Sequence, residues 1–245
     1  MEAGDRGEIM PFEKPEDFYK VYAAFKRYRT PVLKKKHMRW YDREFWSPAR
    51  CTPETSVLEL GSGPGEFLAY LKQMGVKRFL GVEMNPEAIQ AMPPGLDEHL
   101  NKSDVWDFLD AAAESEPYDR VAILDFLEHF SAIEGVRLLE KIKTVLAPDG
   151  LVVIRVPNMA SPWGGIHQFA DLTHKCAYTP ISLEQLGMAA GYKTLQFLPQ
   201  RRGSPIRRFA EDRLHGLLSS ILSFNPVIWS PNMIAIMKRN TGDEV

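Results

Sequence analysis

A short glycine-rich loop constrains the fold of this chain more than any other stretch of its sequence. In "VLELGSGPGEFL", residues 57–68, the glycines Gly61, Gly63 and Gly65 separate a short apolar run from a helical pattern. Glycine lets the backbone approach a ligand closely, and the N-terminus of the following helix attracts anionic groups. A strand, a glycine-rich turn and a helix in this order are typical of the nucleotide-binding unit of open α/β sheets. The loop therefore predicts a ligand at the carboxyl edge of a parallel sheet.

The rest of the chain alternates strand and helix patterns. Runs typical of buried strands occupy residues 56–61, 78–85, 121–124, 151–158, 193–199 and 232–239. Helical patterns occupy residues 65–75, 86–92, 132–150 and 182–192. We expect Ser182 to cap the last of these helices. Because strands that alternate with helices favour a doubly wound sheet, we predict an α/β fold with a mostly parallel sheet.

Two helical pieces precede this pattern. The first has apolar side chains at helical spacing, at Phe18, Val21, Tyr22 and Phe25. The second is expected to begin with Thr30 as its cap and Pro31 in its first turn. We divide the chain into a tail and helical extension at residues 1–50 and a domain at residues 51–245, with an insert at about 200–230.

Composition excludes several classes of protein. The chain has 245 residues and a formal net charge of −2, so it has no overall basic field for nucleic acid. Its only cysteines are Cys51 and Cys176, too few for a disulfide framework or a thiolate zinc site. The acidic N-terminal stretch lacks the apolar core of a signal peptide, and no apolar run is long enough to span a bilayer. We therefore expect a cytoplasmic protein.

Acidic residues near the strand ends indicate the kind of nucleotide. Glu66 directly follows the glycine loop and opposes a pyrophosphate, which disfavours NAD. Glu83 ends the second strand about twenty residues after the loop, where a carboxylate can accept hydrogen bonds from both ribose hydroxyls. Asp104 lies where a third acidic group could reach the exocyclic amine of adenine.

The chain resembles class I S-adenosylmethionine-dependent methyltransferases through five segments in order: "ELGSGPG", "GVEMN", "SDVWDFL", "ILDFLEHF" and "LAPDGLVVIRVPN". The resemblance covers roughly residues 55–200 and implies a seven-stranded Rossmann-like sheet with S-adenosylmethionine as cofactor. It places the glycine loop under the methionine part of the cofactor and Glu83 on its ribose. The cofactor-binding residues that it implies are Glu59, Gly61, Ser62, Gly63, Gly65, Glu83, Met84, Asp104, Val105 and Asp125.

The segment "DFLEHF", residues 125–130, bears on the acceptor. It is similar to a segment of methyltransferases that act on quinones, sugars and small metabolites, and it lacks the N/D-P-P-Y/F motif of nucleic-acid amine methylases. His129 follows the fourth strand, beside the expected methyl position. A histidine that titrates near neutral pH can remove the proton of a hydroxyl acceptor. His129 could equally cap the next helix, so both roles stay open.

Residues 166–180, "IHQFADLTHKCAYTP", gather His167, Asp171 and His174. These side chains could bind a divalent metal, could bind the acceptor and take its proton, or could only hold a loop together. The sequence favours a loop over a long helix, and hard ions such as magnesium prefer carboxylates. Asp171 is placed to orient one histidine. We therefore predict no metal, and catalytic roles for His129, His167, Asp171 and His174.

The same stretch resembles a group of methyltransferases encoded with bacterial surface-polysaccharide (O-antigen and capsule) enzymes. The shared positions are Pro157, Asn158, His167, Phe169, Asp171, Thr173, His174, Pro180, Leu183, Gly191 and Tyr192. The resemblance implies an O-methyltransferase for a sugar hydroxyl or a terminal sugar phosphate, on an acceptor that could be lipid-linked. The alternatives are an enzyme for a quinone-type or aromatic metabolite, an RNA methylase, and a scaffold that binds the cofactor without catalysis.

The insert at residues 200–230 combines apolar residues with a cluster of arginines: Arg201, Arg202, Arg207 and Arg208. Such a segment could be a lid, a dimer face, or an interfacial helix near a lipid-linked glycan. Packing in the core is the simplest alternative. We include peripheral contact with the inner membrane through residues 201–230 as an expectation, and the oligomeric state stays open.

Overall fold

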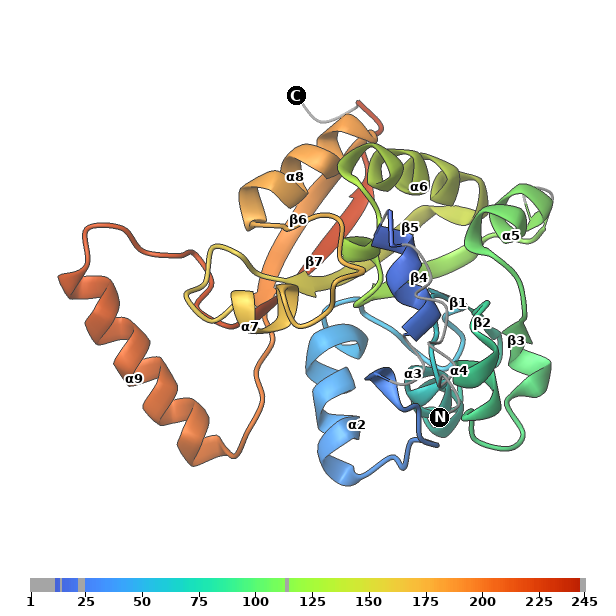
Figure 1. Cartoon of the computed structure of the whole chain (residues 1–245), viewed down its shortest axis with the longest axis horizontal. Coiled ribbons are helices and arrows are strands. Elements are labelled where there is room, and N and C mark those ends of the chain that lie inside the picture. The colour runs from blue at the N-terminus through green and yellow to red at the C-terminus, as the bar shows by residue number, and fades with distance from the viewer. Residues whose placement is uncertain (1–11, 14, 22–24, 113–114, 243–245) are drawn as a thin grey trace, which may run out of the picture.

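Seven strands form one sheet through the middle of the protein (Figure 1). The computed structural model describes residues 12–13, 15–21, 25–112 and 115–242. The strands are β1 (Val57–Leu60), β2 (Phe79–Val82), β3 (Leu100–Asn101), β4 (Tyr118–Leu124), β5 (Leu146–Pro157), β6 (Tyr192–Pro199) and β7 (Asn232–Arg239). Their order is β3-β2-β1-β4-β5-β7-β6, and of these strands β7 alone runs antiparallel to its neighbours. The predicted mostly parallel, seven-stranded, Rossmann-like sheet is confirmed.

Helices cover both faces of the sheet because successive strand residues point to opposite sides. The α-helices are α2 (Lys35–Tyr41), α3 (Glu66–Gln73), α4 (Pro86–Gln90), α5 (Val105–Ala111), α6 (Ala132–Val145), α7 (Gly165–Gln168), α8 (Pro180–Ala189) and α9 (Pro205–Ile221). Short helical turns are η1 (Pro15–Val21), η2 (Asp42–Trp46), η3 (Asp97–His99) and η5 (Leu127–His129). Val121 and Ile123 of β4 pack in a core with α5, α6 and α8, whereas Ala122 packs in a second core with α2, η2 and α3.

The N-terminal extension contributes to the second core. Helix α2 continues into η2, one turn of π-helix, where Phe45 packs edge-on against Phe67 of α3 with ring centroids 4.7 Å apart. The first predicted helical piece is present as the 3₁₀ turn η1. Tyr22, which belongs to the predicted helical piece, lies outside the described residues. Residues 1–11, where no signal peptide is expected, also lie outside them. The division at residue 50 stays a prediction.

The second helical piece begins later than predicted. Its N-cap is Lys34 and its first residue is Lys35, so the expected cap at Thr30 and first turn at Pro31 are wrong. Thr30 and Val32 are exposed, so a helical turn there would bury little apolar surface to stabilise it.

Helix α8 begins earlier than predicted. Its N-cap is Thr179 rather than Ser182, because the two residues form a reciprocal capping box. The Ser182 N–H donates to Thr179 Oγ1 at 3.2 Å, and the Thr179 N–H donates to Ser182 Oγ at 2.9 Å. Pro180 fits the first helical position, where its fixed φ suits a helix and its missing N–H is not needed. Strand β3 is also absent from the predicted set, since two residues are too short to show a strand period.

Helix α9 projects away from the sheet (Figure 1), and none of its residues is buried. Core packing, the simplest interpretation of the insert, is therefore wrong for this helix. Within the described ranges, no helix combines the length and the apolar character that crossing a membrane requires.

The Thr179 cap can be tested by stability. Replacing Thr179 by Ala should lower the free energy of unfolding by about 1 kcal/mol, because α8 loses the side-chain acceptor of its first turn. Ser182→Ala leaves that acceptor in place and should cost less. Urea unfolding followed by circular dichroism measures both variants. A larger loss for Ser182→Ala would mean that the helix begins at residue 182.

Candidate active site

The glycine loop lies at the carboxyl end of β1, where the strand order turns from β2 on one side to β4 on the other. Gly61, Gly63 and Gly65 have φ of 72°, 53° and 76°, values that favour glycine. A Cβ on Gly61 would run into the ring of Phe126, whereas a Cβ on Gly63 would meet nothing within 4 Å. The loop is therefore packed on one side and open at Gly63, as a ligand cradle requires.

Glu83 connects the end of β2 to this loop. Its Oε2 accepts a hydrogen bond from the Gly63 N–H at 2.8 Å, and its Oε1 accepts from the N–H groups of Met84 at 2.9 Å and Asn85 at 2.7 Å. These bonds hold the carboxylate at the edge of the open loop. The position suits the predicted contact with a ribose, since each carboxylate oxygen can accept more than one hydrogen bond.

Two buried polar side chains under the loop lack partners. Glu59 and Ser62 are 4% and 6% exposed, and neither Glu59 Oε2 nor Ser62 Oγ has a hydrogen-bond partner among the described residues. Burial raises the pKa of Glu59 well above its usual range. A buried polar atom without a partner is costly unless a ligand or water satisfies it. Together with the open cradle at Gly63, these atoms fit a ligand with an amino-acid end and a ribose, as S-adenosylmethionine has.

Three other predicted cofactor residues follow β2 and β3, two neighbouring strands of the sheet. Asp104 caps α5, and its Oδ1 accepts a hydrogen bond from the Trp106 N–H at 2.7 Å. Val105 is buried, and Met84 is exposed directly after Glu83. Their contacts with adenine and ribose stay predictions.

Asp125 is engaged by a buried arginine. It follows β4 with a φ of 56°, and its Oδ1 and Oδ2 accept hydrogen bonds from Arg155 Nε at 2.9 Å and Nη2 at 2.6 Å. Arg155 Nη1 also donates to Glu44 Oε2 at 3.1 Å. Both carboxylate oxygens of Asp125 are thus used within the protein, and its predicted contact with the cofactor stays a prediction.

The four predicted catalytic residues share one cavity. His129, at the end of η5, and His167, Asp171 and His174, which follow β5, all line a space of about 390 Å³. The other polar side chains in its wall are Lys26, Asp125, Glu128 and Asn232. The structure therefore brings together residues that precede β5 and residues that follow it in the sequence, and their catalytic roles stay predictions.

A hydrogen-bond chain fixes the tautomer of His129. The Thr173 hydroxyl donates to Asp171 Oδ1 at 2.6 Å, and its oxygen lies 3.0 Å from His129 Nδ1. Because Thr173 has one hydroxyl hydrogen and the carboxylate takes it, His129 Nδ1 must be the donor toward Thr173. The Tyr19 hydroxyl oxygen, 3.2 Å from the same nitrogen, then accepts as well. The lone pair of the neutral imidazole is therefore on Nε2.

His174 is held in the same tautomer. Its Nδ1 lies 2.9 Å from the backbone oxygen of Gln168, which can only accept, so its lone pair is also on Nε2. The two rings meet edge to face with centroids 4.7 Å apart. Burial, with a smaller contribution from His174, lowers the pKa of His129 to about 4, and burial also lowers the pKa of His174. Both imidazoles are neutral at pH 7 and each can take a proton.

The same side chains could hold a cation by distance alone. One donor atom from each of His129, Asp171 and His174 lies within 4.8 Å of the others. Asp171 Oδ1, however, already accepts from both the hydroxyl and the N–H of Thr173, and Lys26 Nζ lies 3.9 Å from Oδ2. Because a positive charge already accompanies the carboxylate, the arrangement favours proton chemistry over a metal.

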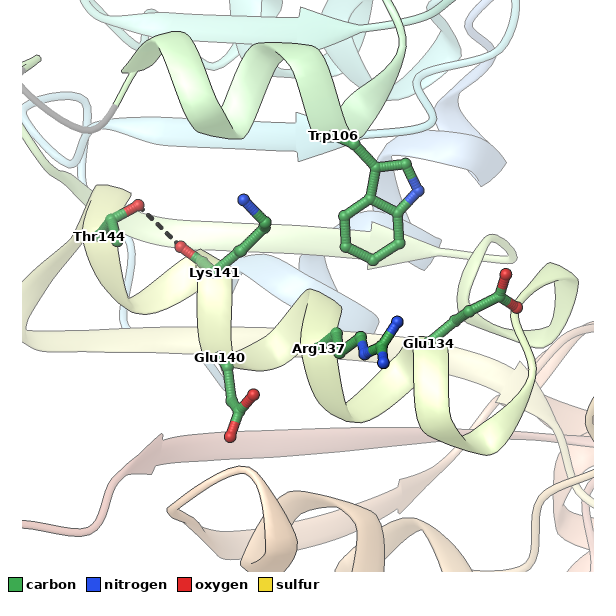
Figure 2. A pocket seen from close by; sticks show the side chains of 6 residues that line it. All are labelled: Trp106, Glu134, Arg137, Glu140, Lys141 and Thr144. Carbon is green, nitrogen blue, oxygen red and sulfur yellow. Dashed lines mark hydrogen bonds between the residues drawn. The ribbon is translucent and has the colours of Figure 1, made fainter.

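A larger hollow of about 580 Å³ lies between α5 and α6 (Figure 2). Its wall consists of Trp106, Glu134, Arg137, Glu140, Lys141 and Thr144, of which the last five come from the surface of α6. None of the predicted site residues lines it. We assign the site to the smaller cavity.

Several residues of the site were not predicted, among them Lys26 and Asn232 in the cavity wall. Thr173 orients His129, Glu128 lines the cavity and is buried, and Arg155 fixes Asp125. A signal existed for Arg155, since a charge in the apolar strand "LVVIRVPN" requires a buried partner. Thr173 and Glu128 lie within segments that carried the resemblance, but nothing in the sequence indicated their contacts.

The sequence model of a family described as a methyltransferase domain matches residues 25–196. No curated protein sequence is significantly similar to this chain. Many solved structures are similar. A SAM-dependent methyltransferase from Archaeoglobus fulgidus is 21% identical with a TM-score of 0.63, over 91% of this chain and 99% of that chain.

Two further structures have bound ligands or a stated reaction. The plantazolicin methyltransferase BpumL, in complex with a monoazolic desmethylPZN analog and SAH, is 18% identical with a TM-score of 0.58, over 91% of this chain and 90% of that chain. The mitomycin 7-O-methyltransferase MmcR is 16% identical with a TM-score of 0.58, over 92% of this chain and 59% of that chain. At these identities the likeness shows the fold alone.

Glu83 can be tested by cofactor affinity. Calorimetry with S-adenosylhomocysteine should show binding to the wild type and at least about tenfold weaker binding to Glu83→Ala, because the ribose acceptor and the anchor of the Gly63 loop are both lost. Glu87→Ala on the exposed side of α4 is the matched control and should bind normally. Equal affinity of all three proteins would contradict the assignment.

Thr173 can be tested by catalytic rate. Thr173→Val removes the acceptor for His129 Nδ1–H, so kcat should fall by about tenfold or more with unchanged affinity for S-adenosylhomocysteine. Thr173→Ser keeps the hydroxyl and should restore most of the rate. If Ser and Val variants are equally slow, the side chain acts through packing rather than through its hydroxyl.

Proposed function

The chain belongs to the methyltransferase-domain family, and we propose that it is an O-methyltransferase acting on a sugar hydroxyl of a surface polysaccharide. S-adenosylmethionine supplies an electrophilic methyl group when bound. A hydroxyl oxygen attacks well only if its proton leaves as the new C–O bond forms, so the acceptor side needs a base. The observation that carries the proposal is the neutral His129 imidazole in the wall of the cavity, with Nδ1 held by Thr173 and Nε2 available.

His129 takes the hydroxyl proton on Nε2 and keeps its own proton on Nδ1. The positive charge that forms on the ring is stabilised through Thr173 by the carboxylate of Asp171. Because its pKa is lowered to about 4, the ring is unprotonated at neutral pH and does not ionise the hydroxyl beforehand. It accepts the proton late, when bond formation has made the hydroxyl acidic.

The polarity of the cavity supports a saccharide. Its wall combines His167, Lys26, Asn232 and Glu128 with few apolar side chains. Burial, and then the charge of Asp125, raise the pKa of Glu128 well above its usual range, which favours a protonated carboxyl group that can donate to a sugar oxygen. Sites for flat aromatic acceptors are usually lined by apolar and aromatic side chains instead.

Two alternatives make different demands on the site. A terminal phosphate is already ionised, so its methylation requires no base and would not depend on His129. A quinone-type or aromatic hydroxyl requires a base but not a polar wall. Methylation of natural products by similar folds, as by the mitomycin 7-O-methyltransferase, keeps the second alternative open to test.

His129 is the residue to replace first. His129→Asn keeps a donor toward Thr173 but has no basic nitrogen, so kcat should fall by about 10²–10⁴-fold while S-adenosylhomocysteine still binds. The wild-type rate should be level near neutral pH and should fall only as the pH approaches about 4, where His129 becomes protonated. His99→Asn, remote from the cavity, is the matched control. An unchanged rate in His129→Asn would reject His129 as the base.

The acceptor class requires its own measurement. Glycans from cells that lack this protein, incubated with the enzyme and S-adenosylmethionine, should gain the mass of one CH₂ on a sugar ring. Fragmentation by mass spectrometry locates the methyl group. Methylation confined to a phosphate, or to aromatic diols in a parallel incubation, would reject the sugar hydroxyl as acceptor.

A further inference from the structure

Helix α9 is amphipathic, and its apolar face is exposed. At 100° per residue, Ile206, Ala210, Leu214, Leu217 and Ile221 fall on one face of the helix. Ile206 is 81% exposed and Ile221 is 68% exposed. An amphipathic helix of a globular protein normally turns such a face toward the core.

The polar face of α9 instead contacts the chain that follows it. The His215 ring stacks on Trp229 with centroids 5.1 Å apart, and Trp229 Nε1 donates to Ser219 Oγ at 3.0 Å. His215 and Ser219 lie on the side of the helix opposite Ile206 and Leu217. These contacts fix the orientation of α9 and leave its apolar face, with Leu214 and Leu217 also exposed, open to solvent.

Both ends of the insert are anchored next to the cavity. Before α9, Arg202 donates to Glu44 at 3.2 Å and lies over the ring of Trp40. After α9, the backbone oxygen of Ile228 accepts from Asn158 Nδ2 at 2.8 Å, and that of Trp229 accepts from Ser161 Oγ at 2.7 Å. These hydrogen bonds therefore hold the segments before and after α9 in place near the end of β5.

The charges around this face are mainly positive. Residues 200–214 contain five arginines and two acidic residues, an excess of +3 in a chain whose net charge is −2. Arg207 and Arg213 border the apolar face on its two sides, where their long side chains can reach outward past it. Phe224, 92% exposed, and Val227 extend the apolar surface beyond the end of the helix.

We propose that α9 lies in the interface of a membrane that contains anionic phospholipid. The apolar face enters the boundary of the acyl chains, and the bordering arginines bind lipid phosphates. A second copy of the chain fits less well. Arg213 lies at the midpoint of the seventeen-residue helix, so a twofold antiparallel pair would bring two like charges together. This proposal concerns α9 alone and does not depend on the acceptor of the methyl group.

Vesicle sedimentation of the full chain tests the proposal. Wild type should bind vesicles of equal parts phosphatidylcholine and phosphatidylglycerol, bind phosphatidylcholine alone much more weakly, and dissociate as salt is added. The double variant Ile206→Glu, Ile221→Glu should lose at least about tenfold in partitioning, because two apolar side chains that enter the lipid are replaced by repelled carboxylates.

The matched control has the same changes elsewhere on the surface. Ile133 and Ile181 are 67% and 77% exposed on α6 and α8, so Ile133→Glu, Ile181→Glu alters charge and hydropathy equally. It should partition like wild type, and both variants should bind S-adenosylhomocysteine, which shows that they fold. Equal loss in both variants would overturn the proposal. The proposal would also be overturned if the wild type did not bind vesicles and light scattering detected a wild-type dimer that the α9 variant abolishes.

Discussion

The buried guanidinium of Arg155 joins the parts of the chain that surround the site. It extends from β5, binds Asp125 through two hydrogen bonds and binds Glu44 of η2 through a third. A buried cation is costly unless its donors are paired, so these partners must stay in place for the sheet to be stable here. Glu44 also accepts from Gln200 at 3.3 Å and from Arg202, which begins the α9 insert. One ion-pair network thus ties the N-terminal extension, the end of β4 and the base of α9 to the same strand.

The cavity that His129 lines includes residues distant in sequence, and this network holds two of the segments that supply them, at Asp125 and Asn232. Phe25 and Lys26 come before the first core helix, Asp125 follows β4, and Asn232 begins β7. The cofactor cradle, in contrast, is local, since Gly63 and Glu83 come from adjacent strands and contact each other directly. The glycine loop and Glu83 are also the residues for which the resemblance to class I methyltransferases gave the most detailed expectations.

The sequence predicted the sheet because short apolar runs alternate with helical patterns along the chain, but it placed two helix starts wrongly. Thr30 has the chemistry of a cap and lacks a buried face after it, whereas Ser182 is the third residue of a capping box that Thr179 begins. The sequence predicted catalytic roles for His129, His167, Asp171 and His174; the structure places all four in the wall of one cavity, and their roles stay predictions. The role of Thr173 could not be predicted from the sequence. It depends on the Thr173 hydroxyl hydrogen pointing to Asp171 rather than to His129, and these two side chains lie far apart in the sequence.

The low pKa of His129 suits the charge of the reaction that we propose. A methyl donor of the sulfonium class carries a positive charge, so a protonated imidazole beside it would repel the donor before any transfer. Burial and the adjacent His174 keep His129 neutral until the acceptor proton arrives. A bound sulfonium donor would lose its charge on transferring its methyl group, so the site would then tolerate a charge on His129, which Thr173 links to Asp171. A neutral His129 therefore adds no further positive charge to a wall in which Lys26 Nζ already lies 3.9 Å from Asp171 Oδ2.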